Sequence, residues 1–208
     1  MPISYFEEVK RKLVHLSSLW MVVATLLLGQ KQWVSCLIFA ALLVLTLVSE
    51  HDYANGGRCL GRLYGRLFGK MLRNDVKPGQ WIVSGGAPVL AAALMMNVLF
   101  SPVIAAAGLA VMLTGDAFAA LIGRKFGFHK INGKSLEGTL AFIVFGFAAL
   151  ATVFCFSGVA GNAYWWGLAA VIASGIVELF QKQLKLDDNF TIPLAVGIVL
   201  FIYFKGIL

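Results

Sequence analysis

Residues 102–122 read PVIAAAGLAVMLTGDAFAALI, an apolar run that contains one charged side chain, Asp116. The hydrocarbon core of a bilayer is about 30 Å thick, and a helix needs roughly 20 apolar residues to cross it. Runs of this kind recur along the chain, which is 60% hydrophobic and only 13% charged. A soluble globular domain has a charged share of about 25%. The composition therefore predicts an integral membrane protein.

The apolar runs are unbroken, whereas strands of a membrane barrel alternate apolar and polar residues over about ten positions. We therefore predict an all-α polytopic fold of about seven transmembrane helices, with residues 1–208 forming a single transmembrane domain. The first run lacks a small-residue cleavage motif, so we expect a retained helix rather than a signal peptide. The predicted spans are 13–29, 33–49, 81–99, 102–122, 138–157, 163–180 and 191–207.

Basic residues are confined almost entirely to one side of these predicted helices. If the N-terminus is cytoplasmic, the inside segments are 1–12, 50–80, 123–137 and 181–190. These segments hold every Lys and Arg of the chain except Lys31 and Lys205. Short loops rich in Lys and Arg stay in the cytoplasm, so we predict a cytoplasmic N-terminus in the cell (inner) membrane. The acidic residues gather on the same side, where we expect the chemistry.

Asp116 lies inside a predicted span, about two turns before its basic end. A carboxylate at this depth is unfavourable, and ionisable groups inside a membrane usually mark a function. Small residues follow on the same helical face, so a ligand or another helix can approach closely. They are Ala119, Ala120, Gly123 and Gly127. The structural alternative is a helix-packing seam in which Asp116 pairs with Arg124, and we favour the functional interpretation.

A basic loop follows, and Gly133-Lys134-Ser135 opens the next predicted span. Backbone N–H groups at the start of a helix bind anions, and a neighbouring lysine adds charge. Ser135 also suits the N-cap of that helix. The segment is not a Walker P-loop, because Phe128 stands where that motif requires its first glycine and no strand precedes it.

A second polar cluster lies near the C-terminus, where Glu178 is followed by LDDNFTIP at 186–193. Its carboxylate, amide and hydroxyl oxygens suit Mg²⁺, which shares its remaining positions with water and substrate phosphates. The candidate residues are Asp187, Asp188, Asn189 and Thr191. The structural alternative is a helix N-cap at Asn189 or Thr191 with Pro193 in the first turn, which explains one residue of the cluster.

Two further basic stretches lie on the predicted inner side. Residues 57–70 place a glycine and then a cation at every fourth position: Gly57-Arg58, Gly61-Arg62, Gly65-Arg66 and Gly69-Lys70. We slightly favour an amphipathic helix whose cations meet anionic headgroups over a phosphate-binding surface; the glycines permit close packing on a spanning helix. Near the N-terminus, Arg11 and His15 share a helical face, whereas Lys10 and Lys12 are first interpreted as positive-inside charges.

Four motifs occur in order along nearly the whole chain: RKLVH at 11–15, GDAFAALIGRKFG at 115–127, GKSLEGT at 133–139 and DDNFTIPLAVG at 187–197. Together they resemble the polyprenol kinase family of membrane enzymes. That family includes dolichol, phytol and farnesol kinases and the CTP-dependent diacylglycerol kinases. Its distant relative phosphatidate cytidylyltransferase has a His- and Arg-containing C-terminal signature that this chain lacks.

The resemblance implies a catalytic domain that transfers phosphate from CTP to the hydroxyl of a membrane lipid at the cytoplasmic leaflet, with Mg²⁺. The implied catalytic residues are Asp116, Lys134 and Glu137, with Asp116 as a metal ligand or as the base. The implied nucleotide-binding residues are Arg11, Lys12, Arg124, Lys134, Ser135, Asn189 and Thr191. The implied metal ligands are Asp116, Glu178, Asp187 and Asp188. The implied partners are CTP, a lipid alcohol and the bilayer, with no nucleic acid; a homo-oligomer stays open.

Three other functions stay open. A cytidylyltransferase would use the same nucleotide but release pyrophosphate. A transporter could use Asp116 and Glu178 as an ion relay, although the polar residues all gather on one side. A scaffold that binds anionic lipid through residues 58–70 leaves Asp116 unexplained. The three cysteines, Cys36, Cys59 and Cys155, are widely spaced, so neither disulfides nor structural zinc are expected.

Overall fold

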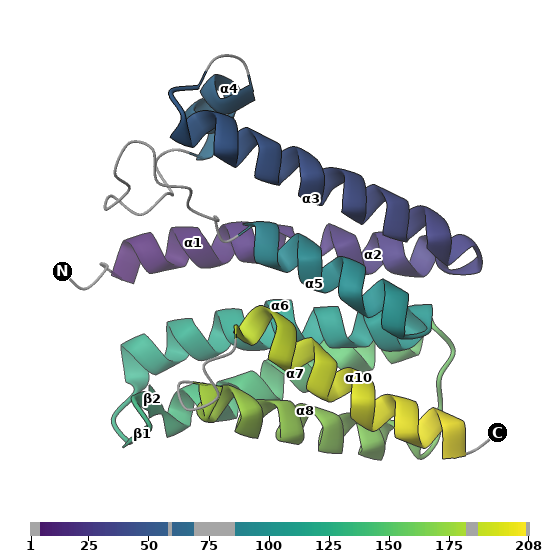
Figure 1. The fold of residues 1–208 in the computed structure, drawn as a ribbon. Helices are drawn as coiled ribbons and strands as arrows, with labels where there is room; N and C mark the ends of the chain where they lie inside the picture. The colour runs from purple at the N-terminus through teal and green to yellow at the C-terminus, as the bar shows by residue number, and fades with distance from the viewer. Residues whose placement is uncertain (1–4, 58–59, 69–85, 182–186, 207–208) are drawn as a thin grey trace.

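The computed structural model describes residues 5–57, 60–68, 86–181 and 187–206, and this part of the chain is almost entirely helical (Figure 1). The elements are α1 (Tyr5–Ser17), α2 (Trp20–Leu27), a 3₁₀ turn (Gly29–Lys31), α3 (Gln32–Ala54), α4 (Leu60–Phe68), α5 (Gly86–Leu99), α6 (Pro102–Phe126), β1 (Lys130–Ile131), β2 (Lys134–Ser135), α7 (Leu136–Phe156), α8 (Ala163–Leu179) and α10 (Asp188–Gly206). Arg58, Cys59, Gly69, Lys70 and positions 81–85 and 207 of the predicted spans lie outside the described residues.

Four helical segments are long and apolar enough to cross a membrane: Gly29–Ala54, which contains α3, then α6, α7 and α10. The helices α5 and α8 are also apolar but shorter. The prediction of an all-α fold with membrane-crossing helices is therefore confirmed. The number of seven spans and the side on which the N-terminus lies stay predictions.

The predicted span 13–29 is divided into α1 and α2. Around the division the backbone closes tight turns, with Ser18 N–H donating to the carbonyl of His15 and Met21 N–H to that of Ser18. The Ser17 hydroxyl donates to the carbonyl of Val14 at 2.6 Å. Serine side chains that bond back to the preceding turn commonly interrupt or bend a helix. The serines at 17 and 18 therefore account for a break that hydropathy alone did not predict.

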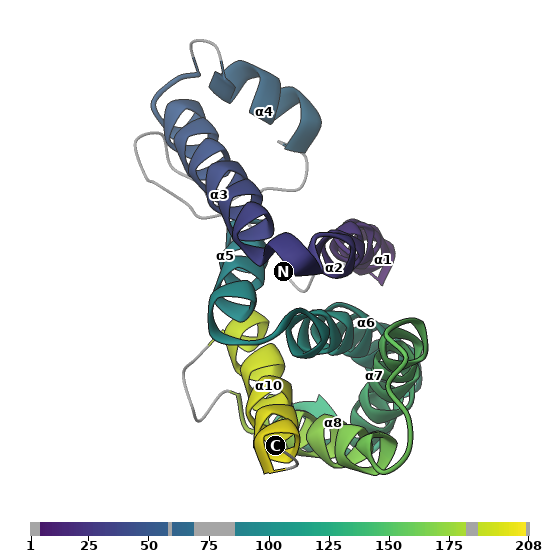
Figure 2. The ribbon, with the colours of Figure 1, turned by 90° about the vertical axis from the view of Figure 1, so that its right-hand side faces the viewer.

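The helix α6 occupies the centre of the structure. Figure 2 shows α6, α7, α8 and α10 arranged as a ring, with α1 and α2 against another side of α6. Small residues let the helices approach closely, as is typical of membrane bundles. A Cβ atom added to Gly115 would lie 2.8 Å from the Phe142 ring, and one added to Gly108 would lie 2.9 Å from the carbonyl oxygen of Pro193. Glycine at these two positions therefore fixes the distances from α6 to α7 and α10.

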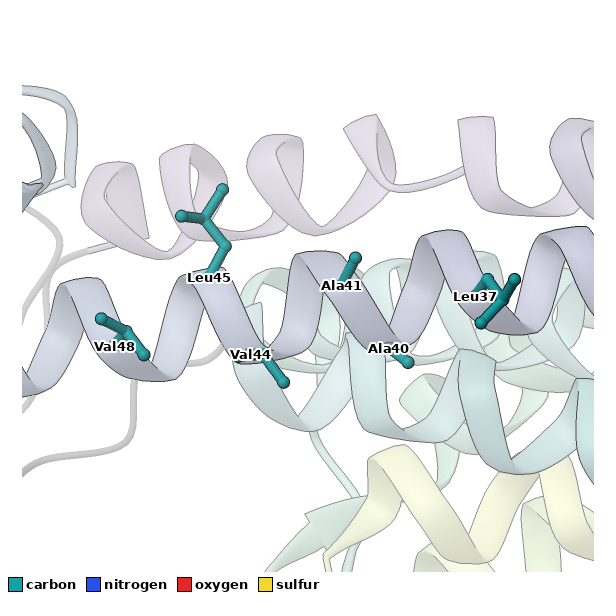
Figure 3. A pocket seen from close by; sticks show the side chains of 6 residues that line it. All are labelled: Leu37, Ala40, Ala41, Val44, Leu45 and Val48. Carbon is teal, nitrogen blue, oxygen red and sulfur yellow. The ribbon is translucent and has the colours of Figure 1, made fainter.

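The helix α3 lies away from this ring, and most of its surface is exposed. Its outer face carries an open apolar groove of about 520 Å³, shown in Figure 3. The lining residues are Leu37, Ala40, Ala41, Val44, Leu45 and Val48, all from this one helix. A helix satisfies its own backbone polar groups and can therefore lie in hydrocarbon. The exposed apolar side chains of α3 then fit contact with lipid tails.

A buried polar network joins α2, α3 and α5. The Asn97 side chain donates to the Thr25 hydroxyl at 3.1 Å and accepts from the Ser35 hydroxyl at 2.9 Å. The Gln32 amide donates to the carbonyls of Asn97 and Phe100 at 2.7 and 2.6 Å. These carbonyls belong to the end of α5, where the helix no longer satisfies them. The network therefore both caps α5 and fixes the position of α3.

The helix α4 packs its glycine face on the end of α3, as the glycine spacing predicts. A Cβ atom at Gly61 or Gly65 would lie 2.4 Å from the backbone or ring of Tyr53. The amide of Gly61 donates to an Asp52 oxygen at 2.7 Å, and buried Tyr64 donates to Glu50 at 3.1 Å. Arg62 and Arg66 are exposed. Contact of these two cations with headgroups stays a prediction.

One end of the molecule gathers the start of α1, the ends of α3, α6 and α8, and the β1–β2 hairpin (Figure 1). The hairpin is antiparallel, with Lys130 opposite Ser135, and turns at Asn132 and Gly133, both at positive φ. The ion pairs formed by Asp116, Glu8, Glu137 and Glu178 all lie toward this end. This is the side that the distribution of basic residues predicts to face the cytoplasm.

Candidate active site

Asp116 is held by two basic side chains from α1, Lys12 and His15. Its Oδ2 atom accepts a hydrogen bond from Lys12 Nζ at 2.5 Å and lies 3.5 Å from His15 Nε2. The three side chains are 16%, 6% and 14% exposed respectively. The structural alternative of an Asp116–Arg124 pair is therefore not what forms, and Lys12 is more than the positive-inside charge that was its first interpretation. Sequence spacing cannot show such a pair, because α1 and α6 are far apart in the chain.

A second charge group lies beside the first. Glu8, 1% exposed, accepts from Arg11 Nη2 at 2.6 Å, and its other oxygen lies 3.4 Å from Arg124 Nη2. Arg124 thus pairs with Glu8 rather than with Asp116. Glu8 was not predicted as a site residue. Its spacing of three, four and seven residues from Arg11, Lys12 and His15, which places all four on one helical face, was the available signal.

Arg11 precedes the predicted first span, and its charge state follows from its neighbours. Burial, the largest single effect, lowers the pKa of its guanidinium, but the hydrogen bond and negative charge of Glu8 together with the charges of Asp116 and Asp188 outweigh it. The net pKa lies above the ordinary value of arginine. Arg11 is therefore a permanent cation within electrostatic range of the acids on α6 and α10.

Lys134 connects the hairpin to α8. Its Nζ atom contacts Glu178, which is 4% exposed, and donates to Oε1 of Gln181 at 3.1 Å. Gln181 was not predicted as a site residue. The charge of Asp116 acts on both Glu178 and Asp188, and the charge of Lys134 acts on Asp188. The two predicted clusters around Asp116 and Glu178 thus lie in one electrostatic environment.

Ser135 has the capping role that its sequence context predicts. Its hydroxyl accepts the N–H of Gly138 at 3.0 Å, which satisfies one free donor at the start of α7. A Cβ atom at Gly123 would lie 2.7 Å from this hydroxyl, and one at Gly127 would lie 2.6 Å from Ser135 Cβ. The small face after Asp116 is therefore filled, in part, by β2 and α7. A contact of Ser135 with phosphate stays a prediction.

Glu137 points back to the hairpin. Its carboxylate lies 2.8 Å from His129 Nδ1 and accepts the backbone N–H of His129 at 3.3 Å. The backbone N–H of Leu136 donates to the carbonyl of His129 at 2.8 Å, so both ends of the hairpin are tied together. These contacts give Glu137 a structural role in holding the hairpin, and a catalytic role for it stays a prediction.

The acidic pair at the start of α10 has two different roles. Asp187 accepts the backbone N–H of Asn189 at 2.9 Å and its side-chain amide at 2.7 Å, which is the geometry of a helix N-cap. The structural alternative placed the cap at Asn189 or Thr191, whereas the structure has Asp187 as the cap. The helix starts at Asp188, so Pro193 lies inside it rather than in its first turn. Asp188 is half-buried and carries the charge that interacts with Asp116.

Comparison with known proteins points to phytol kinases. The chain is 32% identical over 124 residues to phytol kinase of Synechocystis sp., covering 53% of this chain and 50% of that protein. It is 31% identical over 107 residues to phytol kinase 1, chloroplastic, of Arabidopsis thaliana, covering 46% of this chain and 35% of that protein. The alignments thus span half or less of these phytol kinases.

A further relative aligns over a greater length. An uncharacterized protein of Rickettsia prowazekii is 25% identical over 189 residues, which is 90% of each chain. No model of a protein family matches the sequence, and no solved structure matches it. Identity of about 30% with phytol kinases over roughly half the chain supports the resemblance to the polyprenol kinase family that the motifs indicate.

Proposed function

We propose that this protein is a lipid kinase that transfers the γ-phosphate of CTP to the hydroxyl of a membrane lipid alcohol. The acceptor is a polyprenol or dolichol, phytol or diacylglycerol, taken from the cytoplasmic leaflet of the inner membrane. The observation that carries the proposal is the Lys12–Asp116–His15 group, which forms where α1 packs on the apolar helix α6 and in which each side chain is 16% exposed or less. Relatives named phytol kinases share about 30% of the aligned residues.

The position of Asp116 suits an acceptor that is itself part of the membrane. Asp116 lies ten residues before the end of α6 at Phe126, which is about 15 Å along the helix axis. A hydroxyl on a lipid reaches this depth more readily than a water-soluble alcohol does. An ionisable group inside a membrane is unfavourable, and those that occur there usually mark a functional site. A lipid substrate therefore explains why the carboxylate lies inside an apolar helix.

Phosphoryl transfer requires little covalent chemistry from the protein, because charge stabilisation and positioning supply most of the rate. Arg11, Arg124 and Lys134 supply cations for the triphosphate. The lipid oxygen forms a bond to the γ-phosphorus as the bond to the β–γ bridging oxygen breaks, which leaves CDP. Asp116 accepts the proton of the lipid hydroxyl or holds the metal ion. Lys12 and His15 hold its carboxylate in place.

The acids fit Mg²⁺ only as a site completed by the nucleotide. Among the described residues, no three His, Cys, Asp or Glu side chains form a group that could hold a metal ion by themselves. Mg²⁺ is commonly held by one or two carboxylates together with water and substrate phosphates. Asp116 and Asp188 are our candidate pair, because the charge of Asp116 acts on Asp188. Bound there, Mg²⁺ would neutralise charge on the phosphates.

The test is a labelled-phosphate assay. Purified protein in lipid micelles is incubated with Mg²⁺, γ-labelled CTP or ATP, and separately phytol, polyprenol, diacylglycerol or phosphatidate. The proposal predicts label in the lipid fraction with CTP and an alcohol. Label released as pyrophosphate with phosphatidate alone would instead show a cytidylyltransferase, and transfer from ATP but not CTP would correct the donor. If no combination of nucleotide and lipid gives turnover, the transporter and scaffold functions become the candidates.

A further inference from the structure

Glu8 is less exposed than any other charged residue of the described chain, at 1%. One carboxylate oxygen accepts from Arg11 Nη2 at 2.6 Å, and the other lies 3.4 Å from Arg124 Nη2. A buried carboxylate is strongly unfavourable without partners. Arg11, from α1, is therefore hydrogen-bonded to this acid, and Arg124, from α6, lies at ion-pair distance from its other oxygen, which accepts no hydrogen bond from the described residues.

We propose that Glu8 is a positioning residue, which orients the guanidinium groups of Arg11 and Arg124 toward the phosphates of the nucleotide. The inference rests on the proposed kinase function and takes it further, because Glu8 lies outside the four motifs that carry the family resemblance. Glu8 itself contacts no substrate in this assignment. It acts only through the two arginines.

The exposure of the two arginine side chains supports this assignment. Their side chains remain 60% and 40% exposed, although the acid between them is buried. A guanidinium presents five N–H donors in a planar fork, a geometry that suits an exposed contact with a phosphate. Two cations that share one carboxylate also keep a net positive charge. Arg11 in addition lies within electrostatic range of Asp116 and Asp188, which places this charge beside the proposed reaction centre.

Holding the helices together does not account for Glu8. The α1–α6 contact already contains the buried Lys12–Asp116 pair. Buried ion pairs generally contribute less to stability than apolar residues of the same volume would. An apolar side chain at position 8 would therefore hold α1 on α6 at least as well. What a carboxylate adds is a fixed orientation of two forked cations.

The decisive variant is Glu8→Asp, which keeps the charge but withdraws the carboxylate by one methylene. CTP binding is measured by equilibrium dialysis without lipid acceptor, and kcat and KM are measured with acceptor. We expect Kd and KM for CTP to rise about tenfold, with kcat at saturating CTP and the melting temperature close to those of the wild type. The matched control is Glu7→Asp, the same change at the exposed neighbouring position, which should leave Kd and KM unchanged.

A second variant guards against misfolding. Glu8→Gln keeps the side-chain length, and we expect weaker CTP binding because a neutral amide holds guanidinium groups less firmly. Unchanged CTP affinity in Glu8→Asp, tighter binding in Glu8→Gln, or an equal loss in Glu7→Asp would each overturn the role of Glu8. Wild-type protein that binds CTP but phosphorylates no lipid would refute the kinase function alone. Normal wild-type turnover with unchanged KM in Glu8→Asp would refute the role of Glu8 alone.

Discussion

Lys12 Nζ lies 2.5 Å from Asp116 Oδ2, although 104 residues separate the two in the chain. The pair brings α1 onto the central helix α6 at the end of the molecule where Glu8, Arg11 and Arg124 also meet. A buried carboxylate and a buried ammonium each require a partner to remain charged. The first helix is therefore a part of the candidate site rather than only a membrane anchor.

The variant Asp116→Asn tests the centre of the site. We expect turnover to fall by at least about 100-fold, because the amide can neither accept the hydroxyl proton nor bind a metal ion well. The protein should remain folded in detergent, as size-exclusion chromatography would show. The matched control is Thr114→Val, which removes a polar group that bonds only to the Ala110 carbonyl of the same helix in the described contacts. Near-normal activity of Asp116→Asn would exclude both roles assigned to Asp116.

The variant Lys12→Met tests the pair from its other side. Removal of one partner of a buried pair leaves the other charge uncompensated, so we expect a loss of stability on the order of 3 kcal/mol. Lys10→Met is the control, since Lys10 is exposed and lies 4.5 Å over the Phe6 ring. The double variant Lys12→Met/Asp116→Asn should regain part of the stability. A thermal melt that is equal for Lys12→Met and Lys10→Met would contradict the buried pair.

The variant Asn97→Leu tests the polar network between α2, α3 and α5. Its side chain bonds to Thr25, Ser35 and the carbonyl of Ala93. Leucine leaves these buried groups without their partner, and we expect a loss of about 1–3 kcal/mol in unfolding free energy. Thr152→Val, an exposed hydroxyl that bonds within its own helix, should change little. Equal denaturation midpoints for the two variants would show that the network does not stabilise the fold.

A pair of variants separates two roles for Glu137. If it serves to hold the hairpin through His129, Glu137→Gln and His129→Ala remove the same contact. We then expect both to lower turnover by similar factors, about tenfold or less, because the catalytic groups themselves remain. Steady-state kinetics at saturating CTP measures this. A loss of about 100-fold in Glu137→Gln with normal activity in His129→Ala would instead support Glu137 as a catalytic residue.

Hydropathy and residue type determined the membrane-spanning, helical character of this protein. An apolar run long enough to cross a bilayer leaves its backbone few alternatives to a helix, and α3, α6, α7 and α10 follow the predicted spans closely. Local motifs were equally informative: the serine cap at Ser135 and the glycine face of α4 on α3 both form as expected. Asp116 was recognised because a charge in an apolar run is unusual whatever the fold.

Only the tertiary structure decided which charges meet. The structural alternative for Asp116 was a pair with Arg124 on the same helix, yet the partner is Lys12 from α1, and Arg124 pairs with Glu8. The break between α1 and α2 and the cap at Asp187 were likewise not predicted. Helix formation depends on neighbours within a few residues, so a single sequence reveals it. Ion pairs between helices depend on how whole helices pack and rotate, and that is determined by contacts distributed over the entire chain.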